Sequence, residues 1–224
     1  MAEIKAVVVD VDGTLTDRNK VMFVSAVEAL RKVQDKGTIV SVVTGNVLPV
    51  ALGISTYVGL RGPIIAENGG MVCYQEKIYQ LFDGELPWKA YEHLRTVMPV
   101  ERLFTDNWRK TEVGLKRSND LDKVLEALKG WDLNIEATGF AIHIMNKGHG
   151  KIAGVRKMAE IMGLKIEEIA AFGDSDNDVC TLSQCGYGVA VANASEAAKK
   201  AAKYVASKPH ADGVIEGLEL LGLL

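Results

Sequence analysis

The chain starts with a short apolar segment that ends in two aspartates. Residues from Ile4 to Val9 form a run rich in β-branched side chains, which predicts a strand buried on both faces, as in a parallel sheet. Asp10 and Asp12 follow at once in VVVDVDGTLTD (residues 7–17), although removing a carboxylate from water is costly. The rest of the chain must therefore supply a partner for these charges.

Strands and helices alternate along the first part of the chain. Ser25 and Glu28 have the spacing of a capping box, which predicts the start of a helix that ends at Gly37. A strand over 38–43, a helix over about 49–57 and a short strand over 64–66 are expected next. This alternation predicts an α/β fold with a doubly wound (Rossmann-like), mostly parallel sheet.

The pattern changes after Asn68-Gly69 and returns to alternation at Lys151. We therefore expect a small α+β domain, residues 81–150, inserted into an α/β core made of residues 1–80 and 151–224. The elements expected between these points are a hairpin over 71–74 and 77–81, helices over 87–97 and 120–131, and strands over 111–115, 133–137 and 140–145.

In the last of these strands the residue types alternate. Phe140, Ile142 and Ile144 take turns with Ala141, His143 and Met145, which predicts an antiparallel sheet with one buried face. His143 is then expected on the polar, exposed face, and His210, in the loop KPHADG, is expected to be solvated.

Polar residues follow three of the predicted strands. They are Asp10 and Asp12 after the first, Thr44, Gly45 and Asn46 after the second, and Asp174, Asp176 and Asp178 in GDSDND after the strand 169–172. Ligand sites in open α/β sheets lie beyond the carboxyl ends of the strands, so we expect these groups to converge on one crevice. Carboxylates in contact raise one another's pKa and need a cation to stay ionised. Mg²⁺ suits such a cluster, because it binds carboxylate oxygens, waters and phosphate.

Other interpretations fit parts of this pattern. DVDG and GDSDND could each be a solvated turn or a helix cap, but this does not explain polar clusters after three apolar strands. An EF-hand is excluded, because Val179 and Cys185 occupy the positions that need Gly and Glu. A signalling module with Asp10 as a stable phosphoacceptor is disfavoured by the insert and by Asp12, which would hasten loss of the phosphoryl group.

The residues also fit one reaction. A carboxylate such as Asp10 can attack phosphorus and form an aspartyl-phosphate. Asp12 can protonate the leaving oxygen and later activate water. Thr44 with the backbone N–H groups that follow it can hold phosphoryl oxygens, while Lys151 and Mg²⁺ can stabilise the developing charge.

With these residues in view, the chain resembles phosphatases of the haloacid dehalogenase (HAD) superfamily. The matching signatures, in order along the whole chain, are DVDGT (10–14), VVTG (42–45), Lys151 and GDSDND (173–178). The resemblance implies that the insert is a compact cap. The site residues that it implies are Asp10 as nucleophile and Asp12 as general acid/base, Lys151, Thr44, Gly45, Asn46 and Asn177 for substrate, and Asp10, the Asp12 backbone carbonyl, Asp174 and Asp178 for Mg²⁺.

Within the superfamily the chain is most similar to the archaeal phosphoglycolate phosphatase group, on its length, its small cap, TGN at 44–46 and AENGG at 66–70. This likeness implies hydrolysis of 2-phosphoglycolate to glycolate and phosphate. A sugar-phosphate phosphatase or a phosphohexose mutase of the same superfamily remains an alternative.

Composition limits the partners. The net charge of −3 and the pI near 5.9 give no basic surface for nucleic acid, and no apolar run approaches the roughly 18 residues of a membrane span. The three cysteines have no metal-ligand spacing, as expected in a reducing cytosol. We expect a cytoplasmic enzyme for a small-molecule phosphate ester, with a homodimer left open.

Overall fold

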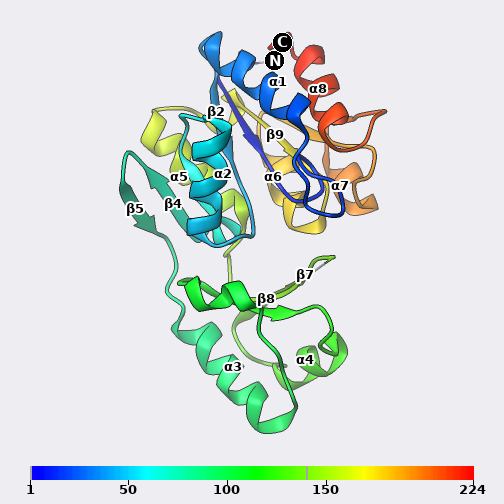
Figure 1. Cartoon of the computed structure of the whole chain (residues 1–224). Coiled ribbons are helices and arrows are strands. Elements are labelled where there is room, and N and C mark those ends of the chain that lie inside the picture. The colour runs from blue at the N-terminus through cyan, green and yellow to red at the C-terminus, as the bar shows by residue number, and fades with distance from the viewer. Residues whose placement is uncertain (1, 140) are drawn as a thin grey trace.

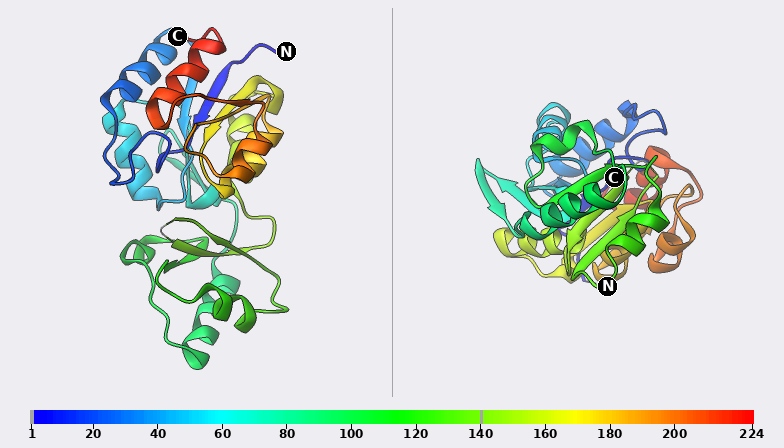
Figure 2. Two further views of the ribbon diagram at one scale, coloured as in Figure 1. Left: turned by 90° about the vertical axis from the view of Figure 1, so that its right-hand side faces the viewer. Right: turned by 90° about the horizontal axis from the view of Figure 1, so that it is seen from below.

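The computed structural model describes residues 2–139 and 141–224, which form two lobes joined by two chain crossings (Figures 1 and 2). The large lobe contains the first and last parts of the chain, and both termini lie at its end far from the small lobe (Figure 1). The crossings fall between β5 (Lys77–Gln80) and α3 (Glu85–Val97), and between β8 (Ala141–Asn146) and α5 (Lys151–Met162). The division at residues 81 and 150 into two domains remains a prediction.

A five-stranded parallel sheet forms the centre of the large lobe. Its order is β11 (Tyr204–Val205), β10 (Tyr187–Ala190), β9 (Ile169–Gly173), β1 (Ala6–Val9) and β2 (Ile39–Val42). A parallel bridge between Val43 and Ile65 places β3 (Ile64–Ala66) next to β2. β3 also pairs antiparallel with β4 (Met71–Tyr74), which pairs with β5. The predicted α/β fold with a mostly parallel sheet is confirmed.

Helices cover both faces of this sheet. On one face lie α1 (Val24–Asp35), α2 (Leu48–Val58) and α8 (His210–Leu220), and on the other lie α5, α6 (Val179–Gln184) and α7 (Glu196–Ala201). Val7 and Val9 of β1 pack on the first side, and Ala6 and Val8 pack on the second. Because side chains alternate along a strand, covering both faces requires an uninterrupted apolar run, as the sequence has here.

The start of α1 differs from the prediction. The helix begins at Val24, with Phe23 as its N-cap, and no side chain caps it, so the capping box of Ser25 and Glu28 does not form. Ser25 already lies in the first turn, where its hydroxyl is not at the capping position. The helix is stabilised instead by burial of its apolar face, including Leu30 and Val33.

The small lobe is an antiparallel three-stranded sheet covered on one face by helices. Its strand order is β6 (Glu112–Lys116), β8 and β7 (Leu133–Ala137), and its helices are α3 and α4 (Leu121–Ala127). Val113, Leu115, Ile142 and Ile144 pack against these helices. The other face of the sheet lies toward the large lobe (Figure 1).

The predicted one-faced character of β8 is wrong. Every residue from Ala141 to Met145 is buried, and His143 is only 1% exposed. The face that was expected to meet water meets the large lobe, where His143 contacts Asn68. Phe140, which was expected to share the apolar face, lies outside the described residues.

Candidate active site

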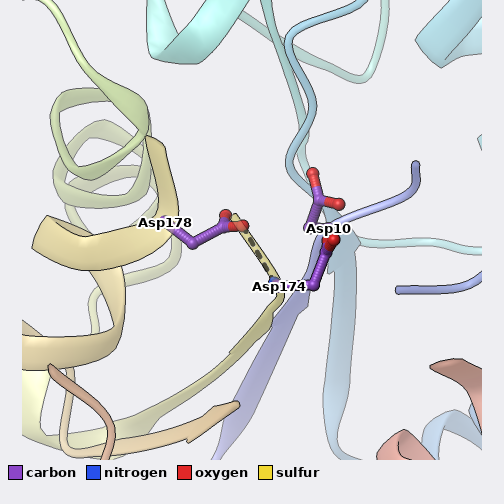
Figure 3. Close-up of side chains that lie close together, drawn as sticks. All are labelled: Asp10, Asp174 and Asp178. Atoms are coloured by element: carbon purple, nitrogen blue, oxygen red, sulfur yellow. Dashed lines mark hydrogen bonds between the residues drawn. The ribbon is translucent and has the colours of Figure 1, made fainter. Parts of the chain in front are cut away.

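The adjacent strands β1 and β9 end at the same edge of the sheet. Val9 is opposite Phe172, and the Asp10 N–H donates to the Phe172 carbonyl at 3.0 Å. The chain passes from β1 to β2 on one side and from β9 to β10 on the other, so the loops separate at this edge and leave room for a ligand. Asp10 and Asp174 therefore emerge side by side (Figure 3).

Three carboxylates meet at this point. One oxygen each from Asp10, Asp174 and Asp178 lie within 4.8 Å of one another, and Asp178 reaches toward the other two from across the loop (Figure 3). Asp178 is oriented by the backbone N–H groups of Asp174 and Ser175, which both donate to its Oδ2 at 3.1 Å. Asp176, by contrast, is exposed and accepts a hydrogen bond from Ser195, outside the cluster.

Lys151 lies between two of these carboxylates. It is the first residue of α5, only 1% exposed, and its Nζ donates to Asp10 Oδ1 at 2.6 Å and to Asp178 Oδ1 at 2.7 Å. Burial opposes the charged ammonium, but Asp10 and Asp178 outweigh it and raise the pKa of Lys151 above its ordinary value. Lys151 is therefore a buried cation.

The cluster as a whole carries excess negative charge. Burial raises the pKa of Asp10 well above its ordinary value, with Asp178 and Asp174 adding to the rise and Lys151 opposing it. Burial and then Asp178 raise the pKa of Asp174 to about 6. Three carboxylates and one ammonium leave two negative charges, which one divalent cation would neutralise. The residues present thus fit Mg²⁺, which prefers oxygen ligands.

Gly13 and Thr14 explain the remainder of the DVDGT signature. Gly13 has φ +91°, and a side chain there would collide with the Asp174 carboxylate. The Thr14 hydroxyl donates to Asp174 Oδ1 at 2.8 Å. Both residues therefore position a carboxylate that lies 160 residues after Thr14 in the sequence.

The side chain of Asp12 is not part of the carboxylate cluster and has other partners. Its Oδ2 accepts from the Asn46 amide at 2.6 Å, and Lys20 lies 3.4 Å from its Oδ1. The side chain of Asp12 is therefore held apart from Asp10, as separate roles would require. A contribution of Asp12 to a metal site, through its backbone carbonyl, remains a prediction.

Thr44 and Gly45 follow β2 and are buried. The Thr44 Oγ1 accepts from the Asn46 N–H at 3.1 Å and from the Asn46 amide at 3.0 Å, which leaves the hydroxyl hydrogen to donate to a ligand. Gly45 is buried, with the side chain of Asn68 packed against it.

Asn68 links three parts of the site, a role that the sequence did not reveal. Its Oδ1 accepts from Asn177 at 3.1 Å, and its Nδ2 contacts Glu112 at 3.0 Å and His143 at 3.2 Å. The predicted substrate residue Asn177 thus has its amide bound to Asn68, and a contact with substrate remains a prediction. The AENGG segment was a usable signal, because Asn68 has φ +49°, a conformation that asparagine tolerates better than most residues.

Glu67 and His149 strengthen the junction between the lobes. Glu67 Oε2 accepts from the N–H groups of Lys110 and Thr111 at 2.9 Å and from the Thr111 hydroxyl at 2.8 Å. The His149 Nε2 lies 2.7 Å from the Glu67 carbonyl, and the ring stacks on Phe82. The turn after β3 is therefore bonded both to the segment before β6 and to the crossing between β8 and α5.

His210 was expected to be solvated, and this prediction is wrong. It is partly buried, and its Nδ1 lies 2.7 Å from the Gly13 carbonyl, to which the Asn193 amide also donates at 2.9 Å. His210 and Asn193 therefore support the turn after Asp12.

Glu112 is the charged centre of the contact between the lobes. Burial would raise its pKa, but Arg109 and then His143 outweigh this and lower the pKa of Glu112 to about 2. The charged form is thus favoured in the folded protein, and its stabilising effect is complete above the ordinary pKa of 4.5 and lost as the pH falls toward 2.

We predict that Glu112→Gln lowers the free energy of unfolding at pH 7 by about 3 kcal/mol, the free-energy equivalent of this shift. The difference from wild type should shrink as the pH falls from 4.5 toward 2, because Glu112 of the unfolded wild type then takes up a proton while the folded protein keeps the charge. Urea unfolding at a series of pH values measures this, with exposed Glu126→Gln as the control. Two parallel pH profiles would contradict the assignment.

The chain is similar to known proteins over nearly its whole length. The family model described as haloacid dehalogenase-like hydrolase matches residues 7–102 and 105–218. A phosphoglycolate phosphatase of Methanothermobacter thermautotrophicus is 37% identical, over 96% of this chain and 97% of the relative. One of Archaeoglobus fulgidus is 38% identical over 98% of each chain. The crystal structure of protein 0175 of Thermoplasma acidophilum superposes with a TM-score of 0.92 at 28% identity, covering 99% of this chain and all of that one.

The fold, the carboxylate cluster and these matches define the class: the chain belongs to the haloacid dehalogenase-like hydrolases. Within that family it is a phosphatase, as the names of its curated relatives and the shared signatures indicate. None of the helices within residues 2–139 and 141–224 has the length and apolarity that a membrane crossing requires.

Proposed function

We propose that the protein is a Mg²⁺-dependent phosphomonoesterase that converts 2-phosphoglycolate to glycolate and phosphate through an aspartyl-phosphate on Asp10. The observation that supports this most is the contact of Lys151 with both Asp10 and Asp178 at the ends of β1 and β9. A cation beside a nucleophilic carboxylate both holds that carboxylate and attracts a phosphoryl group.

In the first step Asp10 attacks phosphorus. Its Oδ1 accepts from Lys151, and the other carboxylate oxygen would form the new O–P bond. The bond between phosphorus and the ester oxygen breaks, and that oxygen takes a proton from Asp12. Asn46 holds Asp12 in place for this transfer.

In the second step water attacks the phosphorus of the aspartyl-phosphate. Asp12, now deprotonated, accepts a proton from the water, and the bond between Asp10 and phosphorus breaks. Phosphate leaves, and both aspartates return to their starting states. Thr44, whose hydroxyl hydrogen has no acceptor among the described residues, and Lys151 would hold the phosphoryl oxygens in both steps.

Mg²⁺ would be held by Asp10, Asp174 and Asp178, with the Asp12 carbonyl as a further ligand. When bound, it supplies positive charge against the phosphoryl oxygens. Thr14 and the N–H groups of Asp174 and Ser175 keep the carboxylates oriented for it.

The small lobe would act as a cap that excludes water from the aspartyl-phosphate. The buried contacts of Asn68 with Glu112 and His143 support a closed arrangement. Opening would bend the two crossings, near Leu81 and at residues 148–150, where Gly148 has φ +78°.

The substrate is proposed from the names of the curated relatives, which cover nearly the full chain at 33–38% identity. We predict the highest kcat/KM for 2-phosphoglycolate in a panel that includes 3-phosphoglycerate, ethyl phosphate and glucose 6-phosphate, measured as released phosphate with Mg²⁺. Chelation of the metal should remove the activity. A preference for the hexose phosphate, or its isomerisation without phosphate release, would favour the sugar-phosphate alternatives.

A further inference from the structure

A cavity lies next to Asp12 where the two lobes meet. Its volume is about 350 Å³, at the lower end of ligand pockets, so it suits a small molecule. On the large lobe its walls include Asp12, Arg18, Lys20 and His210. On the small lobe they include Thr138, in the turn after β7.

The position of this cavity matches where the leaving group must go. In an in-line displacement the leaving oxygen lies on the side of phosphorus opposite the attacking oxygen. Asp12, which would protonate that oxygen, lines the cavity, whereas Asp10 and Lys151 do not. The organic part of the substrate would therefore extend from Asp12 into this space.

The carboxylates around the cavity already have partners. Asp17 accepts from the N–H groups of Asn19 at 2.8 Å and Val21 at 2.9 Å, and these bonds lower its pKa. Asp12 is bound by Asn46 and lies near Lys20, and Asp174 is bound by Thr14. None of them is directed at Arg18.

Arg18 differs from these groups. Its guanidinium forms no ion pair or hydrogen bond with any residue in the described ranges, yet it lines the cavity. Asp17, held by Asn19 and Val21, fixes the loop that carries Arg18. His210, which stacks on Phe23 and contacts the Gly13 carbonyl, also lines the cavity.

We propose that Arg18, with Lys20 beside it, binds a carboxylate on the leaving group and so selects small phosphomonoesters with an anionic leaving group. A guanidinium pairs with a carboxylate in a bidentate manner, which favours such esters over those of neutral alcohols. This inference rests on the proposed reaction, because it takes Asp12 as the group that meets the leaving oxygen. Arg18 would then be the residue that recognises the carboxylate of 2-phosphoglycolate.

Two substrates isolate this contact: 2-phosphoglycolate, and ethyl phosphate, which has a methyl group in place of the carboxylate. In Arg18→Gln the ratio of kcat/KM for 2-phosphoglycolate to that for ethyl phosphate should fall by about 10-fold to 100-fold. Arg18→Glu should lower the ratio further by repulsion. Arg61→Gln is the matched control, because Arg61 is an exposed arginine paired with Asp35 in the loop before β3, at the other end of the strands.

The outcomes separate the two proposals. An unchanged ratio in both Arg18 variants, with wild type still preferring 2-phosphoglycolate, would overturn the role of Arg18 and leave the phosphatase reaction standing. A wild-type protein that hydrolyses neither ester would overturn the proposed function, and the inference with it. Calorimetric binding of 2-phosphoglycolate to Asp10→Asn, with and without Arg18→Gln, gives a second measurement: the double variant should bind at least about 10-fold more weakly.

Discussion

Asp10→Asn should abolish turnover, with a loss in kcat of about 10⁴-fold or more, as expected when a covalent nucleophile is removed. In the variant the amide oxygen of Asn can still accept the hydrogen bond that Lys151 donates to Asp10 at 2.6 Å in wild type. The fold should therefore persist. Asparagine does not form the acyl phosphate, because a neutral amide is a poor nucleophile. Single-turnover phosphate release from 2-phosphoglycolate measures the loss, and thermal unfolding checks the fold.

Asp176→Asn provides the control for this change. It makes the same substitution in the acidic loop, but Asp176 is exposed and bonded to Ser195 rather than to the cluster. Its kcat should stay within a few-fold of wild type. If Asp10→Asn kept substantial activity while remaining folded, another residue would have to be the nucleophile.

Lys151→Met should damage both stability and activity. The change leaves Asp10 and Asp178 buried without their shared cation, and breaking a buried ion pair in this way costs about 3–5 kcal/mol. Loss of positive charge at the phosphoryl group should lower kcat by a further factor of about 10²–10³ among molecules that remain folded. Added Mg²⁺ should recover part of the stability, because binding to the folded state stabilises it.

Lys157→Met tests whether the effect belongs to the position rather than to the residue type. Lys157 lies on the same helix, but its ion pair with Glu160 is partly exposed, so its loss should cost at most about 1 kcal/mol. Chemical unfolding with and without Mg²⁺, together with phosphate release, compares the two variants. Equal stability of Lys151→Met and wild type without metal would show that the buried cation does not hold the carboxylates together.

The small lobe shows where local sequence patterns were insufficient. The alternation in β8 correctly placed Ile142 and Ile144 against the helices, because that contact forms within the lobe. The same alternation wrongly predicted that His143 is exposed. His143 instead contacts Asn68, which is 75 residues away in the sequence. A two-residue period shows that a strand has two faces, but it does not show what covers each of them.

The acidic loop gives a similar lesson at shorter range. The spacing of Asp174, Asp176 and Asp178 does not tell which of them turn inward. The short helical turn over Asp176–Asp178 decides it, since Asp178 is buried and accepts backbone N–H groups while Asp176 points outward.

The amino-acid sequence by itself determined the α/β core, the strand ends that carry Asp10, Thr44 and Asp174, and the family. These features depend on apolar runs and on motifs whose residues are close together in the sequence. Only the tertiary structure decided that Lys151 bridges Asp10 and Asp178, that Asn68 joins the lobes, and that Arg18 lines a cavity. Such contacts join side chains distant in sequence, and their directions are set only when the strands, loops and lobes have packed together.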